Sequence, residues 1–189
     1  MKIAIIDYGS GNVFSVSSAI NRLGAEPIIT SDKELIRTAD KIIFPGVGHG
    51  KFAMDQLIEK QLDQFIPTLK QPFMGICLGM QLMCEYTEEG NVKGLGIFEN
   101  VKVVKFTDAP KIPHMGWNRT MNVDSDQVNS EVYFVHSYYV ELNKYSTSVT
   151  NYGNRFSATL QKDNFYGCQF HPEKSGKEGE LILRNFLNQ

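Results

Sequence analysis

The sequence feature that most constrains the fold is a short apolar segment that ends in a cysteine and runs directly into a helical pattern. Gly75 and Gly79 lie two residues before and after Cys77. This G-x-nucleophile-x-G pattern is typical of a tight turn from a β-strand into an α-helix, where larger flanking side chains would collide. An ordinary buried cysteine at a strand–helix junction is the alternative. The pattern predicts an α/β fold with the Cys77 sulfur at a helix N-terminus, whose partial positive charge favours a thiolate.

A second pattern, near the C-terminus, could supply partners for this cysteine. Side chains alternate along a strand, so His171 is expected to share a face with Gln169. Pro172 should end the strand's hydrogen bonding, and Glu173 lies close enough to orient the imidazole. Alone, His-Pro-Glu is more often a solvated turn. Together with Cys77, it predicts a nucleophile, a base and an orienting carboxylate.

The first half of the chain alternates strand and helix signals, which predicts a parallel sheet with helices on both faces. Gly24 is expected to end the first helix, and Ser31 to cap the second. The expected strands are 2–7, 27–29, 41–44 and the segment before Cys77, and the expected helices are 13–23, 31–36, 53–69 and the one after Cys77.

From about residue 94 the pattern changes to longer strands. These are expected over 96–106, 132–141, 147–151, 156–161 and 166–170, with a turn at 163–164 and a final helix over 179–187. The sequence therefore predicts one domain, 1–189, with a three-layer α/β fold. Its central sheet should be mostly parallel, with antiparallel strands in the C-terminal half.

Composition excludes several classes of protein. A net charge of −2 without a run of lysine or arginine argues against nucleic-acid binding. No stretch approaches the ~18 apolar residues of a membrane span. Three cysteines at unrelated spacings, without C-x-x-C, predict neither a disulfide framework nor a zinc site. We expect a cytoplasmic protein that needs no metal or cofactor.

Two glycine-rich loops superficially resemble nucleotide-binding loops. The loop at 9–11 follows a strand, but Phe14 occupies the third glycine position of a dinucleotide fingerprint. The segment 46–51 has Pro45 where a phosphate loop needs its first glycine, and Phe52 in place of Ser or Thr. Both loops are better explained as tight backbone at the C-terminal edge of a parallel sheet, where such folds place their sites.

The remaining cysteines and histidines have structural explanations. Cys84 and Cys168 are expected in the core, and His114 and His136 as hydrogen-bonded structural histidines. His49, beside the second glycine loop, is left open.

With these motifs in place, the chain resembles the glutaminase subunits of imidazole glycerol phosphate synthase, class I (triad) glutamine amidotransferases of histidine biosynthesis. The segments that carry the resemblance are 7–12, 45–48, 75–81, 113–118, 134–138 and 170–175. The cysteine elbow and His-Pro-Glu are shared across class I amidotransferases, whereas the Asp-Tyr-Gly start and the Met-Gly-Trp-Asn block indicate this subunit. The segment 49–52 departs from the usual small-Phe-Gly, which puts the shape of that loop in doubt.

The resemblance implies hydrolysis of L-glutamine to glutamate and ammonia. Cys77 would attack the side-chain amide, His171 would transfer the protons, and Glu173 would orient His171. Backbone N–H groups of Leu78 and of the loop at Val47 would stabilise the oxyanion. The residues expected to hold the substrate are Gly48, Gln81, Ser137 and Tyr138.

Because the glutaminase occupies the whole chain, ammonia should pass to a separate synthase subunit. By resemblance this partner is a (β/α)₈ cyclase, which forms a heterodimer with the chain and makes imidazole glycerol phosphate. Trp117 and Lys174 are candidate interface residues, although a core tryptophan and a solvated lysine explain them equally well.

Three alternatives remain open. A paralogue could feed ammonia to another synthase, for example in surface-sugar amidination. A glutaminase of folate or tryptophan biosynthesis usually opens with an Asn-Tyr-Asp-Ser-Phe-like strand end, which is absent here. A non-catalytic binding subunit is disfavoured because all three triad positions are intact.

Overall fold

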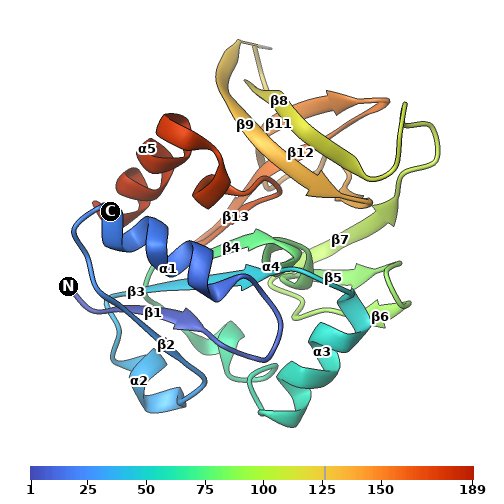
Figure 1. The fold of residues 1–189 in the computed structure, drawn as a ribbon. Coiled ribbons are helices and arrows are strands. Elements are labelled where there is room, and N and C mark those ends of the chain that lie inside the picture. Colours follow the sequence, from blue (N-terminus) through green and yellow to red (C-terminus); the bar gives the residue numbers. More distant parts are fainter. Residues whose placement is uncertain (126) are drawn as a thin grey trace.

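A computed structural model describes residues 1–125 and 127–189. Its described part forms a nine-stranded central sheet and a four-stranded second sheet (Figure 1). The nine strands, in spatial order, are β2 (Pro27–Thr30), β1 (Ile3–Ile6), β3 (Lys41–Gly46), β4 (Phe73–Cys77), β13 (Phe165–Cys168), β12 (Asn154–Lys162), β11 (Ser146–Tyr152), β8 (His114–Asn122) and β9 (Val128–His136). The second sheet consists of β10 (Tyr138–Val140), β7 (Phe98–Lys105), β5 (Cys84–Thr87) and β6 (Val92–Lys93).

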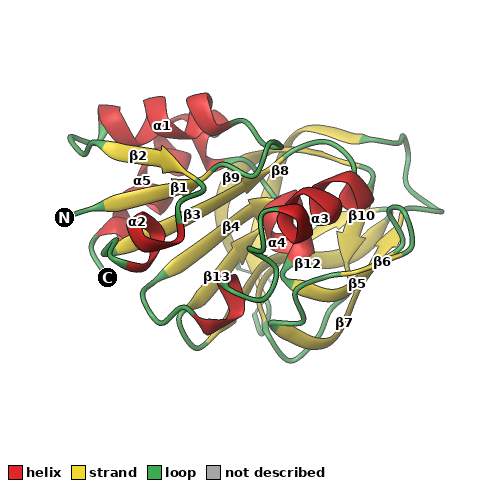
Figure 2. Ribbon diagram, turned by 90° about the horizontal axis from the view of Figure 1, so that it is seen from below, coloured by secondary structure: helices red, strands yellow, loops and turns green. Residues whose placement is uncertain are grey.

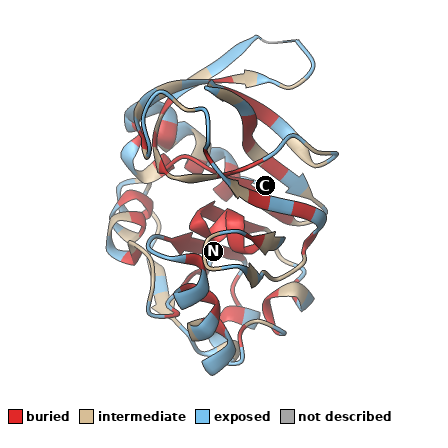
Figure 3. Cartoon of the chain, turned by 90° about the vertical axis from the view of Figure 1, so that its right-hand side faces the viewer, coloured by how far each residue is buried: buried red, intermediate tan, exposed pale blue. Residues whose placement is uncertain are grey.

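The central sheet is parallel in one half and antiparallel in the other. Strands β2, β1, β3, β4 and β13 pair in parallel, whereas β13, β12, β11, β8 and β9 pair antiparallel (Figure 2). Strands β1, β3 and β4 are buried along their whole length, as strands covered on both faces must be (Figure 3). The predicted three-layer α/β fold is confirmed.

Helices cover both faces of the parallel half. They are α1 (Val13–Arg22), α2 (Lys33–Arg37), α3 (Gly50–Glu59), α4 (Leu78–Leu82) and α5 (Gly176–Leu187), with 3₁₀ turns η1 (Ile66–Thr68) and η2 (Pro172–Lys174). Ile3 and Ile5 pack in one apolar cluster with α1 and α5, whereas Ala4 and Ile6 pack in a second with α2 and α3. This division follows from the alternation of side chains along a strand.

Two helix predictions were wrong in detail. Asp32, not Ser31, caps α2, because its carboxylate accepts the N–H groups of both Glu34 and Leu35. The helix expected over 53–69 begins at Gly50 and ends at Glu59, since Gln61 adopts a left-handed φ of 55° and turns the chain. The prediction for the first helix was confirmed: Gly24, with φ of 85°, directly follows its C-cap.

The antiparallel half differs more from expectation. The strand expected over 132–141 is two strands, β9 and β10, because the chain bends at Ser137 and leaves β8 to pair with β7. Strand β8 was not predicted. The strand expected over 166–170 ends at Cys168, so His171 lies in the loop beyond it. The predicted two-residue turn at 163–164 is confirmed, since Lys162 pairs with Phe165 across it.

Candidate active site

The turn from β4 into α4 places Cys77 in a strained conformation. Its φ of 54° lies in the left-handed region that non-glycine residues rarely adopt. A Cβ on Gly79 would clash with the carbonyl oxygen of Phe44, and one on Gly75 would come within 2.9 Å of the Met80 nitrogen. Only glycine fits at either position, as the sequence predicted. The fold therefore fixes the Cys77 sulfur at the start of α4.

The pair formed by His171 and Glu173 lies on the loop between β13 and α5. The imidazole Nδ1 is 2.8 Å from Glu173 Oε1, and the two side chains are 2% and 1% exposed. Burial disfavours the charged imidazole, but Cys77 and then Glu173 outweigh burial and raise the pKa of His171 to about 10. The imidazole is therefore charged at neutral pH.

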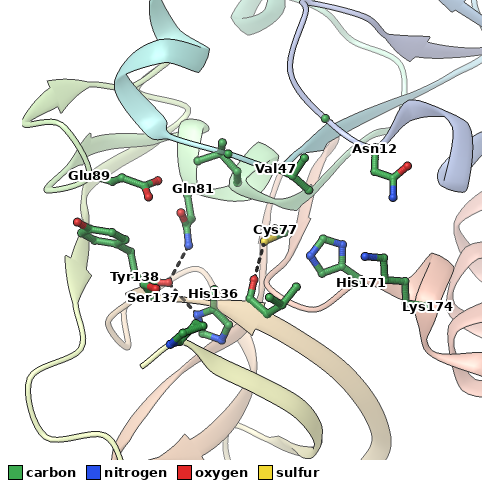
Figure 4. A pocket seen from close by; sticks show the side chains of 15 residues that line it. Asn12, Val47, Cys77, Gln81, Glu89, His136, Ser137, Tyr138, His171 and Lys174 are labelled. Atoms are coloured by element: carbon green, nitrogen blue, oxygen red, sulfur yellow. Dashed lines mark hydrogen bonds between the residues drawn. The ribbon is translucent and has the colours of Figure 1, made fainter. Parts of the chain in front are cut away.

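The side chains of Cys77 and His171 lie close together in the site (Figure 4). The thiol is directed at the carbonyl oxygen of Val135, 3.7 Å from Sγ. His171 Nε2 is buried and has no hydrogen-bond partner among the described residues. Cys77 and His171 both line one cavity, and in Figure 4 the imidazole lies beside the sulfur. Such an arrangement suits proton transfer between a nucleophile and a base.

This cavity has a volume of about 630 Å³, ample for an amino acid. The predicted site residues that line it are Val47, Gly48, Cys77, Leu78, Gln81, Ser137, Tyr138, His171 and Lys174. Glu173 lies behind His171. Trp117 is not among the lining residues: it is 55% exposed and packs edge-on against Tyr133.

The loop at 46–48 is held by the first β–α loop. The Ser10 hydroxyl donates to the Val47 carbonyl oxygen at 2.5 Å, and the Tyr8 hydroxyl donates to that of Pro45 at 3.1 Å. The glycine loop at 9–11 therefore positions backbone beside the cavity. The segment 49–52, whose shape the sequence left in doubt, forms the start of α3.

Gln81 uses its amide nitrogen inside the protein. The nitrogen lies 2.8 Å from the Tyr138 carbonyl oxygen and 2.9 Å from Gln169 Oε1. Both N–H groups of Gln81 are thereby occupied, which leaves its Oε1 as the atom available to a ligand.

Glu89 is a cavity residue that the sequence did not single out. It carries the only carboxylate among the described lining residues, and its Oε2 accepts the N–H of Gly50 at 3.0 Å. Burial raises the pKa of Glu89, although Gly50 and His49 oppose the shift. Glu89 follows a short strand that was not predicted, so no sequence signal placed it beside Cys77.

His114 and His136 behave as the structural histidines that were predicted. Their rings lie 3.0 Å apart from Nδ1 to Nε2, and His136 Nδ1 is 2.8 Å from the Tyr138 carbonyl oxygen. Burial lowers the pKa of His114 to about 4 and that of His136 to about 3, so both are neutral. His49 is exposed and lies outside the cavity lining.

The two other cysteines are buried in the apolar clusters, as expected. Burial raises the pKa of both Cys84 and Cys168, so each remains a thiol. No three His, Cys, Asp or Glu side chains within 1–125 and 127–189 are grouped closely enough to hold a metal ion. Over the same residues, no helix has the length and apolarity to span a membrane.

Comparisons with known proteins identify the family of this chain. The family model "Glutamine amidotransferase class-I" matches residues 4–189. Fold and site together define a class I glutamine amidotransferase. The "Imidazole glycerol phosphate synthase subunit HisH" of Bacteroides fragilis (strain YCH46) is 52% identical, with 99% of both chains covered, and that of Haemophilus influenzae is 48% identical, with 100% and 98% covered. The chain therefore belongs to the HisH family of class I glutamine amidotransferases.

A solved structure agrees on the fold. A crystal structure of a glutamine amidotransferase, 18% identical in sequence, superimposes with a TM-score of 0.73 and covers 98% of this chain and 97% of its own.

Proposed function

We propose that this chain is the glutaminase subunit of imidazole glycerol phosphate synthase. It hydrolyses L-glutamine to L-glutamate and ammonia, and the ammonia serves histidine biosynthesis. The observation that carries the proposal is Cys77 on a strained strand–helix turn, in one cavity with His171 held by Glu173. The relatives at about half identity over their full lengths specify the pathway.

Each step of the reaction can be assigned to these residues. The Cys77 thiolate adds to the side-chain amide carbon and forms a tetrahedral oxyanion. His171 gives its Nε2 proton to the departing nitrogen, so ammonia leaves and a thioester remains. His171 then takes a proton from water as the water attacks the thioester. Collapse of the second oxyanion releases glutamate and restores the Cys77–His171 pair.

The oxyanion needs backbone donors close to Cys77. Leu78 begins α4, and the first N–H groups of a helix have no partner within it. Val47, across the cavity, is the candidate for the second donor. One such donor typically contributes ~3 kcal/mol to lowering the barrier.

Lining groups on the other side of the cavity suit the amino-acid end of glutamine. Backbone groups of Gly48, Ser137 and Tyr138 line the cavity there, and the free Oε1 of Gln81 can accept a hydrogen bond. The carboxylate of Glu89 suits the substrate's α-ammonium group, because opposite charges attract strongly where water is partly excluded.

Replacing Glu89 with glutamine should raise the KM for glutamine ~10- to 100-fold, the loss expected for a charge-assisted hydrogen bond. The kcat should change less, because the ammonium group lies far from the reacting amide. Steady-state kinetics would measure both constants. Glu88→Gln is a matched control, since Glu88 is exposed and its carboxylate accepts from the Lys105 N–H outside the cavity. Equal KM values for the two variants would show that Glu89 does not bind the substrate.

The partner that we propose is a cyclase subunit with a (β/α)₈ fold, docked over the mouth of the cavity. Lys174, at the mouth, and the exposed Trp117 are the candidate contact residues. Docking there would keep the released ammonia out of bulk water and pass it to the acceptor substrate.

The isolated chain should be a poor glutaminase, and the cyclase with its acceptor substrate should raise kcat ~100-fold or more. Val47 is flanked by Gly46 and Gly48, so its peptide can rotate once the hydrogen bond from Ser10 to the Val47 carbonyl oxygen breaks, and it would align its donor only when the partner docks. Glutamate release would be measured for the chain, the complex, and the complex with acceptor. Ammonia in place of glutamine is the control, because it bypasses this site. Full activity of the isolated chain would contradict partner control.

A further inference from the structure

A buried amide side chain that does not line the cavity contacts the nucleophile. Gln169 is 0% exposed, and its Nε2 lies 3.7 Å from Cys77 Sγ. Its Oε1 lies 2.9 Å from Gln81 Nε2. The two amides thus connect the sulfur to the backbone of the cavity wall, whose hydrogen bond from Gln81 to Tyr138 is drawn in Figure 4.

The direction of these hydrogen bonds follows from a backbone carbonyl. The Tyr138 carbonyl oxygen can only accept, so the atom of Gln81 that lies 2.8 Å away must be its NH₂ group. That group also faces Gln169, which must therefore present its oxygen to Gln81. The Gln169 NH₂ group is left pointing at the sulfur.

Three further side chains fix the Tyr138 carbonyl group in place through a chain of hydrogen bonds. His136 Nδ1 donates to the Tyr138 oxygen at 2.8 Å, and His114 Nδ1 lies 3.0 Å from His136 Nε2. Asn118 completes the chain, with its side-chain nitrogen 3.2 Å from His114 Nε2. Since both histidines are neutral, each has one donor and one acceptor nitrogen. The hydrogen bonds therefore run in one direction, from Asn118 through His114 and His136 to the Tyr138 carbonyl oxygen.

We propose that Gln169 is a further catalytic residue, whose side-chain N–H donates to the sulfur of Cys77 and stabilises the thiolate that attacks glutamine. The proposal rests on the function assigned above. A thiol can donate its proton to the Val135 carbonyl, but a thiolate has none to donate and faces that oxygen unfavourably. An N–H on another side of the sulfur offsets this repulsion, in addition to the charge of His171.

Two variants separate this role from simple packing. Gln169→Glu keeps the shape of the side chain and the oxygen that accepts from Gln81, but it presents a carboxylate to the sulfur. Gln169→Met removes the donor without adding charge. If Gln169 only fills space, Gln169→Met should react as wild type, because it removes the donor without adding charge. If it donates to the thiolate, Glu should be the more damaging change.

The test is the second-order rate constant for alkylation of Cys77 by iodoacetamide, measured against pH. At neutral pH we expect Gln169→Met to react ~10-fold more slowly than wild type, as for loss of a hydrogen bond to a charged group, and Gln169→Glu to react more slowly still. Raising the pH should bring the three rates together, because it forms the thiolate in all three. The kcat for glutamine should fall in the same order.

Gln161→Glu is the control for added charge, since Gln161 is exposed on β12 and should react as wild type. Thermal unfolding of each variant would show that it is folded. If Gln169→Met does not fold, Gln169→Leu, which also lacks a donor and adds no charge, takes its place. Alkylation of folded Gln169→Glu at the wild-type rate across the pH range would overturn the proposal. Because alkylation needs no turnover, absence of glutaminase activity in the wild-type complex with the cyclase and acceptor substrate would refute the assigned function separately.

Discussion

Replacing Cys77 with alanine should abolish glutamine hydrolysis, with a loss on the order of 10⁴-fold or more, as for other enzymes that lose their nucleophile. The β4–α4 turn would persist, because Gly75 and Gly79 make it possible and alanine is smaller than cysteine. Ammonia-dependent synthesis by the complex should therefore remain at the wild-type rate. Glutamate release and ammonia-dependent product formation would be measured on the same preparation.

Cys84→Ala is the matched control for this variant. Cys84 is fully buried and its sulfur donates to the Met80 carbonyl oxygen, away from the cavity. Removal of this thiol should leave glutamine hydrolysis unchanged. Iodoacetamide should likewise label Cys77 first, since burial keeps Cys84 and Cys168 protonated. Glutamate release at the wild-type rate by Cys77→Ala would refute the assignment of Cys77 as the nucleophile.

The parts of the fold that the sequence predicted well are those with local signals. The apolar strands β1, β3 and β4 are buried on both faces, so each reads as a continuous hydrophobic run. The elbow depends on glycines whose clashes are with neighbouring backbone, and glycine is visible in a sequence. These signals sufficed to place Cys77 on a parallel sheet.

The antiparallel half carries weaker signals. In β8, polar residues alternate with exposed apolar ones such as Met115 and Trp117, so the buried face offers few hydrophobic residues. Strands β9 and β10 form a nearly continuous apolar run, and only their pairing with different partners reveals the break at Ser137. Partner choice is a tertiary property that no single segment encodes.

The same distinction separates the site residues that were predicted from those that were not. Cys77 and His171 lie in short sequence motifs in which each neighbouring residue has a steric or hydrogen-bonding role. Glu89 and Gln169 are positioned by contacts with residues far away in sequence, with Gly50 in the first case and Gln81 in the second. Their side chains are ordinary in sequence and become significant only when the fold assembles them.

Replacing His171 with alanine should be nearly as damaging as the loss of Cys77, at ~10⁴-fold in kcat, because both proton transfers pass through its Nε2. Glu173→Gln should cost ~10- to 100-fold less than His171→Ala, since it keeps the shape that orients the imidazole and removes only the charge. Rates of glutamine hydrolysis for both variants in the complex would establish this order. Equal, small losses of kcat in the two variants would indicate that another residue acts as the base.

The charge of His171 also predicts how the nucleophile responds to pH. Because its pKa is raised to about 10, the imidazole stays charged as the pH rises through neutrality and loses its proton only near that value. Between about pH 6 and 9 the positive charge beside the Cys77 sulfur is therefore constant, so wild-type Cys77 should be alkylated faster than Cys77 of His171→Ala throughout this range. In His171→Ala that charge is absent, so alkylation should be slow at neutral pH and rise steadily with pH. Equal alkylation rates in the two proteins would show that the charge of His171 does not act on the Cys77 sulfur, and the proton for the departing ammonia would have to come from another group.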